Sequence, residues 1–463
     1  MKFRYRNEDE MKDSDIEWIG KIPKHWNSIM FKRVIQRVNN GIWGDDAKSN
    51  SDDIPCIRVL NFNRNTMEVK IDNLTIRNIP RIKQKGYLLK KGDLLIEKSG
   101  GGEKSPVGFV VRYNYELPAV YANFMAKISL NNNTISEYIK YLCSAIYNRK
   151  LHLDSINQTT GIQNLDSEIY FKRYIALPNV LEQEKIAKFL DEKTAEFDSI
   201  IFKKESLVKK LEEAKKSLIS EVVTGKVKVV KTSDGYELVQ RKKEEMKDSK
   251  VEWLGDIPRD WKVKRLRFLG NLQNGISKSS EEFGHGYPFI SYGDVYKNIK
   301  LPKKASGLVN STLNDQKIYS VLEGDVFFTR TSETIEEIGI ASTCLDTIPE
   351  ATFAGFLIRF RPKKDNLYKE FSKYYFRCEL NRSFFVKEMN LVTRASLSQT
   401  LLKNLSVLIP SFDEQVKIAE CLDYKIGTID KLIKINSNQI LKLKKAKQSL
   451  ISEAVTGKIE ILE

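Results

Sequence analysis

Apolar residues recur at alternating spacings of three and four in two long stretches of the chain. The two rows are Leu190, Lys193, Phe197, Ile200, Lys204, Leu207, Leu211, Ala214 and Leu218, and Leu422, Lys425, Ile429, Leu432, Asn436, Gln439, Leu443, Ala446 and Leu450. A repeat of 3.5 residues is typical of coiled-coil helices. Each stretch opens on a capping box, at 179–182 or 411–414, and closes on Thr-Gly-Lys, a favoured helix end. The pattern predicts two helices of about 40 residues, or about 60 Å each.

The two predicted helices belong to one chain, so they pair most economically with each other. An antiparallel pair would place the two intervening regions at its opposite ends. The polar positions Lys204, Asn436 and Gln439 cost stability but can fix the register of such a pair. The alternative is that both helices are solvated and face other chains.

The chain is built twice. Residues 11–26 recur at 246–261 with 10 of 16 positions identical, 181–193 recur at 413–425 with eight of 13, and 217–226 recur at 449–458 with nine of 10. Between these blocks the similarity collapses, although Gly-Asp at 92–93 and 324–325 and a Pro at 178 and 410 still align. The repeated blocks form a common frame, and the diverged regions between them are variable parts. This organisation is expected of two domains that recognise different targets. Gene duplication with neutral drift is the alternative, but drift would also erode the frame helices.

The variable regions mix strand-like runs, such as 87–99 and 320–330, with helical stretches at 136–151 and 369–389, which predicts α+β domains. Residues 227–245 are expected to form a charged, irregular linker. The tail at 459–463 matches the start of that linker, which predicts that the chain ends lie close together and close a circular pseudo-repeat. The expected segments are a scaffold at 1–26, a variable domain at 27–178, a long helix at 179–226, a linker and scaffold at 227–261, a variable domain at 262–409, and a long helix with its tail at 410–463.

The charge of the chain points to a polyanionic partner. Its 463 residues carry 77 Lys and Arg against 61 Asp and Glu, a net charge of +16. An excess of this size favours nucleic acid, with a Lys-rich proteome as the alternative cause. No apolar run approaches the roughly 20 residues of a membrane helix, and no secretory signal opens the chain. Five scattered cysteines without a C-x-x-C make a zinc finger or disulfide framework improbable, and the expected location is the cytoplasm of a prokaryote.

No catalytic constellation stands out in the sequence. A phosphate-binding loop and the methyltransferase motifs are missing, and the three histidines are far apart. Asp93, Glu97 and Lys98 have the spacing of a nuclease site, but the second copy reads GDVFFTR and lacks the second acid. A strand that leads into a loop is therefore the preferred interpretation. Catalytic and metal-binding residues are not expected on this chain.

The frame motifs carry a resemblance to a known family. They are EW(I/L)GxIPxxW at 17–26 and 252–261, EQxKIAxxLDxK at the helix starts, and SLISExVTGK at the helix ends. In this order they resemble the specificity (S) subunit of type I restriction–modification systems. The segment GIQNL at 161–165 also looks like the family, whereas its counterpart TRASL at 393–397 departs from it.

The resemblance implies that each variable domain is a target recognition domain that reads one half of a bipartite, asymmetric site in double-stranded DNA. The long helices would set the spacing and dock two methyltransferase (M) subunits, which methylate adenine N6 with S-adenosylmethionine. Two restriction (R) subunits are an optional addition for ATP- and Mg-dependent cleavage. No cofactor is expected on this chain, which would be non-catalytic. The alternatives are a sequence-specific DNA-binding regulator and a stand-alone restriction enzyme.

DNA reading requires forked or amide donors for bases and Lys, Arg, Ser or Thr for phosphates. Such residues gather in the Gly-rich loop at 98–104, in 329–332, in 159–164 and 393–399, and near two Asn-Gly-Ile segments at 40–42 and 274–276. For Ser, Thr and Asn the alternative is ordinary turn chemistry. Trp18, Trp26, Trp253 and Trp261 are expected to be core anchors. The predicted DNA-contacting residues are Trp43, Arg58, Lys98, Ser99, Gly100, Lys104, Thr160, Gln163, Asn164, Asn274, Ser277, Arg330, Thr331, Ser332, Arg394 and Ser396.

Overall fold

The chain folds into two compact units. The computed structural model describes residues 1–159, 161–332, 337–363, 366–388 and 395–462. The first unit comprises Met1–Ser206 and Ser437–Glu463, and the second unit comprises Leu207–Asn436. Within the described ranges, no helix is long and apolar enough to cross a membrane.

The first unit is organised around a six-stranded sheet. Its order is β5 (Ile35–Asn40), β15 (Met125–Leu130), β11 (Leu94–Glu97), β13 (Val110–Arg112), β9 (Glu68–Val69) and β8 (Phe62–Asn63). A second sheet has the order β14 (Val120–Tyr121), β7 (Asp53–Ile57), β10 (Thr75–Asn78) and β6 (Asp45–Asp46). A third has the order β12 (Ser99–Gly100), β17 (Ile162–Leu165) and β16 (Ile156–Thr159). The short helices are α1 (Arg81–Gln84), α2 (Ser136–Asn148) and α3 (Ser167–Phe171).

The second unit repeats this arrangement although the variable sequences have diverged. Its central sheet has the order β24 (Gly270–Asn274), β31 (Leu357–Pro362), β27 (Val326–Thr329) and β29 (Ala341–Thr343), which matches β5, β15, β11 and β13. The next sheet pairs β26 (Gly307–Val309), β25 (Phe283–Ile290) and β30 (Thr352–Phe353), and a short ladder pairs β28 (Thr331–Ser332) with β32 (Ala395–Ser396). The short helices are α5 (Leu266–Leu269), α6 (Tyr292–Lys297), α7 (Leu313–Ile318), α8 (Lys369–Tyr375), α9 (Glu379–Glu388) and α10 (Gln399–Asn404). The α+β prediction is thus confirmed for both units.

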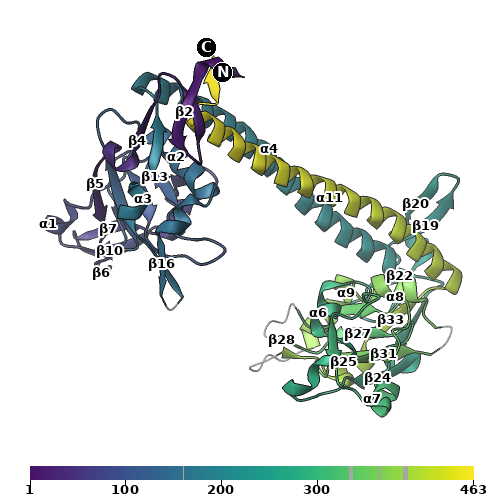
Figure 1. Cartoon of the computed structure of the whole chain (residues 1–463). Coiled ribbons are helices and arrows are strands. Elements are labelled where there is room, and N and C mark those ends of the chain that lie inside the picture. Colours follow the sequence, from purple (N-terminus) through teal and green to yellow (C-terminus); the bar gives the residue numbers. More distant parts are fainter. Residues whose placement is uncertain (160, 333–336, 364–365, 389–394, 463) are drawn as a thin grey trace. The chain divides into compact units, whose positions relative to one another are not determined.

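The frame contributes three matching ladders to each unit. In the first unit these are β18 (Tyr174–Leu177) with β4 (Asn27–Met30), β2 (Met11–Ile16) with β3 (Gly20–Pro23), and β1 (Phe3–Tyr5) with β34 (Ile459–Ile461). In the second unit they are β33 (Ser406–Ile409) with β23 (Lys262–Arg265), β21 (Met246–Asp248) with β22 (Asp256–Pro258), and β19 (Val227–Thr232) with β20 (Gly235–Gln240). The expected irregular linker is wrong over β19 and β20, which form a regular hairpin. The predicted closeness of the chain ends is confirmed, because β1 pairs with β34 as β20 pairs with β19 (Figure 1).

The two long helices pack against each other in antiparallel orientation. They are α4 (Val180–Val223) and α11 (Phe412–Val455), each of 44 residues. In the first unit Lys447 Nζ donates to Asp198 at 2.7 Å. In the second unit Lys215 Nζ donates to Asp430 at 2.6 Å. Partners further along α4 lie earlier along α11, so the predicted antiparallel pair is confirmed (Figure 1).

The inner face of this helix pair differs in part from the predicted rows. The positions Leu190, Phe197, Lys204, Leu211 and Leu218 are at least partly buried as expected, and so are their counterparts in α11. The intervening predicted row is correct at its first positions, where Lys193 and Lys425 are half-buried, and wrong by one residue beyond them. Residues 201, 208 and 215 face inward in place of 200, 207 and 214, and residues 433, 440 and 447 do so in place of 432, 439 and 446. Sequence hydropathy misled here because the inward row contains the half-buried Lys215 and the buried Lys447, whose ammonium groups reach acidic partners.

The ends of both helices are built in the same way. The backbone N–H groups of Glu182 and Glu414 donate the expected N-cap bonds to Asn179 Oδ1 and Ser411 Oγ, at 3.0 and 3.2 Å. Their carboxylates turn to the frame and accept the indole N–H of a buried tryptophan, Trp26 or Trp261, at 2.9 and 2.8 Å. At the far ends Gly225 and Gly457 have φ of 74° and 71°, and a Cβ there would collide with Pro258 or Pro23. The tryptophan therefore connects each frame segment to a helix start.

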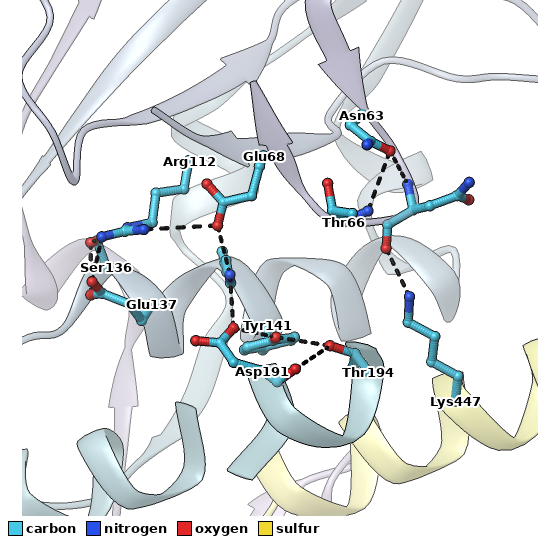
Figure 2. Close-up of polar contacts among 12 residues, drawn as sticks. Asn63, Thr66, Glu68, Arg112, Ser136, Glu137, Tyr141, Asp191, Thr194 and Lys447 are labelled. Atoms are coloured by element: carbon cyan, nitrogen blue, oxygen red, sulfur yellow. Dashed lines mark hydrogen bonds and ion pairs between the residues drawn. The ribbon is translucent and has the colours of Figure 1, made fainter. Parts of the chain in front are cut away.

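Figure 2 shows how the α+β region of the first unit is held on its long helix. Lys140 Nζ on α2 lies 2.7 Å from Glu68 and 3.0 Å from Asp191 of α4, and the Tyr141 hydroxyl donates to Asp191 at 2.6 Å. In the second unit the counterparts of this lysine and tyrosine contact Asp423 of α11 at 2.7 and 2.6 Å. Buried lysines require such pairing, so each unit orients its α+β region on its helix by the same polar contact.

Candidate nucleic-acid interface

In both units the chain leaves the central sheet through a basic residue and enters a short ladder. β11 is followed by Lys98 and β12, and β27 is followed by Arg330 and β28. The carbonyl oxygens of Lys98 and Arg330 each accept a 2.7 Å backbone bond, from Leu165 and Leu397. The described parts of the predicted loops are thus brought together, 98–104 with 161–164 in the first unit and 329–332 with 395–399 in the second.

The ladders of the two units have the same register. Ser99 pairs with Asn164 and Thr331 pairs with Ser396, each position displaced by 232 residues between the copies. In the first unit Ser99 Oγ donates to Asn164 Oδ1 at 2.6 Å. Gly100 pairs with Gln163 on the next rung. Both ladders therefore present small polar side chains beside a cation, which is the chemistry that base edges and phosphates require.

Alternation along β17 places Gln163 differently from the other predicted residues. Its side chain is buried with Leu165, whereas Ile162 and Asn164 are exposed. The Gln163 amide oxygen accepts the Val107 N–H at 3.3 Å and so holds the end of the Gly-rich loop. Gln163 thus shapes the ladder from within, and the exposed polar group on this strand is Asn164.

The Asn-Gly-Ile segments pack against a turn in both units. A Cβ on Gly41 would lie 2.2 Å from the Ala122 carbonyl oxygen, and one on Gly275 would lie 2.1 Å from that of Ala354. Glycine is required at both positions because the backbones approach so closely. Asn40, beside Gly41, accepts a 3.0 Å bond from Lys98 Nζ. In the second unit Gln399 Nε2 donates to Asn274 Oδ1 at 3.0 Å, so both segments join their ladders.

The turns that these glycines contact carry an exposed phenylalanine that the sequence reasoning missed. Phe124 is 55% exposed and Phe356 is 64% exposed. Their carbonyl oxygens accept the backbone N–H of Lys98 at 2.8 Å and of Arg330 at 2.9 Å. The repeat of AVYANFM at 119–125 in ATFAGFL at 351–357, at the same offset of 232, is the signal that could have revealed them.

We refer to residues 40–43, 98–104, 122–125 and 162–165 as the first surface, and to residues 274–277, 330–331, 354–357 and 396–399 as the second surface. The first surface has an aromatic recess of about 340 Å³. Its lining includes Trp43, Arg58, Leu60 and Phe124. The guanidinium carbon of Arg58 lies 5.6 Å from the Trp43 ring centroid, and that of Arg77 lies 4.3 Å from it. In the second surface an exposed Ser277 follows the same Asn-Gly-Ile sequence.

The predicted DNA-contacting residues differ in exposure. The exposed ones are Arg58, Lys104, Asn164, Ser277 and Ser396. The half-buried ones are Trp43, Lys98, Ser99, Gly100, Asn274, Arg330 and Thr331. Thr160 and Arg394 lie outside the described residues, and Ser332 is described only in its backbone, within β28. In the first surface, backbone bonds join the segments that carry Trp43, Lys98 and Asn164. In the second surface, backbone bonds join the segments that carry Asn274, Arg330 and Ser396.

The acidic residues near the first surface serve the fold. Glu97 is buried and pairs with Arg64 at 2.5 Å, and burial raises the pKa of its carboxyl group. Asp93 accepts the Lys90 backbone N–H at 2.8 Å within a turn. Within the described ranges, no group of three or more His, Cys, Asp or Glu residues is placed to hold a metal ion. The nuclease interpretation of Asp93 and Glu97 has no geometric support.

The duplicated frame carries a polar surface with a basic residue in each unit, which is the chemistry expected of a class of protein that recognises two DNA targets. Comparison with known families agrees, since residues 23–210 and 258–445 each match the type I restriction modification DNA specificity domain. The chain belongs to this family and carries two copies of its domain, which confirms the resemblance found in the frame motifs.

Individual relatives match along nearly the whole chain. The chain is 24% identical over 486 residues to the putative type I restriction enzyme MjaX specificity subunit of Methanocaldococcus jannaschii, covering 99% of this chain and 98% of that protein. It is 22% identical to the EcoKI specificity subunit of Escherichia coli K12, with coverage of 95% and 90%. Among solved structures, a chain from work on complex assembly and conformational transition of the type I R-M system matches with a TM-score of 0.69 and 15% identity, covering 94% of this chain and 99% of that one. That structural match supports the fold.

Proposed function

We propose that this chain is the specificity subunit of a type I restriction–modification complex, and that each surface reads one half of a bipartite, asymmetric site in double-stranded DNA. The observation that carries the proposal is the pair of surfaces with one backbone design and different side chains. The recognition domains are 27–178 and 262–409, and the segments 1–26, 179–226, 227–261 and 410–463 form the frame. The net charge of +16 favours the polyanionic partner.

The long helices are proposed to dock two methyltransferase subunits and to set the spacing between the half-sites. Large apolar side chains that are exposed on the helices support docking. Ile200, Leu207 and Leu432 come from the predicted row that does not face inward, and Phe202, Ile435 and Leu441 lie outside both predicted rows. Exposed apolar rows on long helices are typical of surfaces that a partner covers.

Catalysis is proposed to reside on the partners. The methyltransferase subunits would bind S-adenosylmethionine and methylate adenine, and restriction subunits, where present, would use ATP and Mg. This chain then contributes recognition and assembly and binds no cofactor of its own. The absence of a catalytic motif in the sequence supports this division of labour.

The decisive experiment is sequencing of adenine methylation in cells with and without this gene. The proposal predicts that one bipartite motif with a fixed gap loses its methylation when the gene is deleted and regains it on complementation. An unchanged methylation pattern together with sequence-specific DNA binding would favour a regulator instead. Cleavage of DNA by the purified chain without partners would favour a stand-alone restriction enzyme.

A further inference from the structure

Phe124 and Phe356 occupy equivalent β-turns that are fixed in the same way. The turn at 122–125 is closed by a 3.1 Å bond from Met125 N–H to the Ala122 carbonyl, and the turn at 354–357 by a 2.9 Å bond from Leu357 N–H to the Ala354 carbonyl. The first and last residues of both turns are buried. The phenylalanine of each turn is therefore held outward by a backbone that is anchored on both sides.

The surroundings of the two phenylalanines have diverged while the phenylalanine has not. The residue before it is Asn123 in the first turn and Gly355 in the second. The residue after Asn-Gly-Ile is Trp43 in the first surface and Ser277 in the second. A side chain that read a base would be expected to change with the target, as these neighbours have. A ring that is kept, exposed, in two domains of different target is better explained by a contact that both targets offer.

The backbone of each turn is also bonded to the basic residue at the start of its ladder. The Phe124 carbonyl accepts the Lys98 N–H, and the Phe356 carbonyl accepts the Arg330 N–H. A basic residue whose backbone is bonded to the turn of an outward apolar ring suits a duplex whose phosphate is held while the ring presses on stacked bases. Apolar side chains of this kind act as wedges that partly unstack a base step and bend the duplex.

We infer that Phe124 and Phe356 are DNA wedges, one for each half-site, which make a sequence-independent contact with the base stack while neighbouring side chains read the sequence. This inference rests on the proposed function, because it assumes that both surfaces bind DNA. It adds that both domains deform their half-sites by the same device, and it places the sequence-dependent contacts at positions such as Trp43 and Ser277.

The test uses the full chain assembled with its methyltransferase subunits, without S-adenosylmethionine, on duplexes that carry the methylated motif. 2-Aminopurine, whose fluorescence rises when it is unstacked, is placed at successive positions of each half-site other than the adenines that become methylated. Phe124→Ser is expected to abolish the signal in the first half-site and to retain it in the second, and Phe356→Ser is expected to do the reverse. Each variant should weaken binding about tenfold without changing the methylated motif.

Phe268→Ser is the matched control, because Phe268 is also 64% exposed but lies on α5, outside both surfaces. It should leave both signals and the affinity unchanged, and thermal melting of all three variants should match the parent. The inference is overturned if the fluorescence survives both substitutions, if either substitution alters the motif, or if the variants lose their methyltransferase subunits during gel filtration. If no methylation depends on the chain at all, the proposed function fails, which is a different result from intact methylation without unstacking.

Discussion

The first and second surfaces share a backbone and differ in what they display on it. Gly41 and Gly275 are identical because a carbonyl oxygen of the neighbouring turn leaves no room for a side chain. Two residues after each glycine stand Trp43 and Ser277, which have no such constraint. They differ in both size and polarity. The comparison shows that glycine is kept where two backbones meet closely, whereas Trp43 and Ser277, which lack that constraint, have diverged. The exposed Phe124 and Phe356 are the exception, because they are identical without such a constraint.

The cations of the two surfaces differ in a way that changes their chemistry. Lys98 carries a point charge and is bonded to Asn40. Arg330 carries a planar fork, with one nitrogen 3.4 Å from the Gly355 carbonyl oxygen. A fork can bind guanine in a bidentate manner, whereas an ammonium group suits phosphate. The second surface is therefore better equipped for direct base reading at this position.

Replacing residues 262–409 with residues 27–178 would remove the difference between the two surfaces and is expected to have the largest effect. Both halves of the recognised site should then carry the same sequence, because the frame holds either domain in the same way. Sequencing of adenine methylation in cells that carry the chimaera measures this result, and the reciprocal replacement is the control. A chimaera that methylates the parental motif would show that specificity lies outside the exchanged residues.

A change in the long helices should leave both surfaces unaltered and move only their targets apart. Four residues inserted at 203–206 lengthen α4 by about 6 Å, close to two base-pair rises of ~3.4 Å. Polar Lys204 and Asn436 face inward here, so an insertion disturbs less apolar packing than it would elsewhere along the helices. We expect a methylated motif with both half-sites unchanged and a wider gap between them. An active variant with the parental gap would mean that the helices do not set the spacing.

Substitution of the two cations should sharpen the difference between the surfaces. Arg330→Ala should weaken recognition of the second half-site alone, by about 1–3 kcal/mol, if the fork reads a base. Arg330→Lys should restore the salt dependence of binding without restoring base discrimination. Lys98→Ala should mainly reduce the slope of affinity against salt concentration, by about one unit. Titrations of half-site variants at several salt concentrations decide the matter, and equal losses at both half-sites would contradict independent reading.

The smallest expected effect is a pH dependence confined to the first unit. Burial, together with the charge of Arg173, lowers the pKa of His152 from 6.5 to about 4. The unfolded chain then binds more protons between these values, so stability is fully present above about pH 6.5 and is lost as the pH falls towards 4, by about 1–3 kcal/mol. Phe384 stands 232 residues further on, so the second unit has no histidine at the matching position.

Hydrogen exchange at pH 7.5 and pH 5 should therefore show a loss of protection in the first unit that exceeds any loss in the second. His152→Phe should remove that excess. If the first unit of the variant lost as much protection at pH 5 as the first unit of the parent, groups other than His152 would be responsible for the pH dependence.

The sequence was sufficient to predict the repeated frame, because its motifs recur nearly unchanged and helix ends have strong local signals. It was insufficient for the inward helix row, where Lys447 faces inward and Ile200 remains exposed. Hydropathy ranks these two residues in the opposite order, and the tertiary partners of Lys447, the Asp198 carboxylate and the Asn65 carbonyl oxygen, explain the result. The long helices were thus predictable as elements, but the faces that they pair were not.

The candidate site was predicted as separate loops, and their meeting in one ladder depends on pairing between residues far apart in sequence. Strand alternation could have shown that Gln163 shares the inward face with Leu165. Phe124 was missed because an aromatic residue in a mostly apolar segment is normally a core residue. Its exposure results from the turn that Gly41 supports, a contact between distant segments that no local pattern reveals.

The pairing of β1 with β34 makes the polypeptide a ring that has been opened at one of two equivalent hairpins. A gene that began between β19 and β20 and joined β34 to β1 through a short turn would encode the same ring, opened at the other hairpin. The order of the two reading modules along the gene would be reversed, yet each would keep every neighbour that it has now. Circular permutation can therefore reshuffle the coding order of such a protein without changing the DNA sequence that it selects.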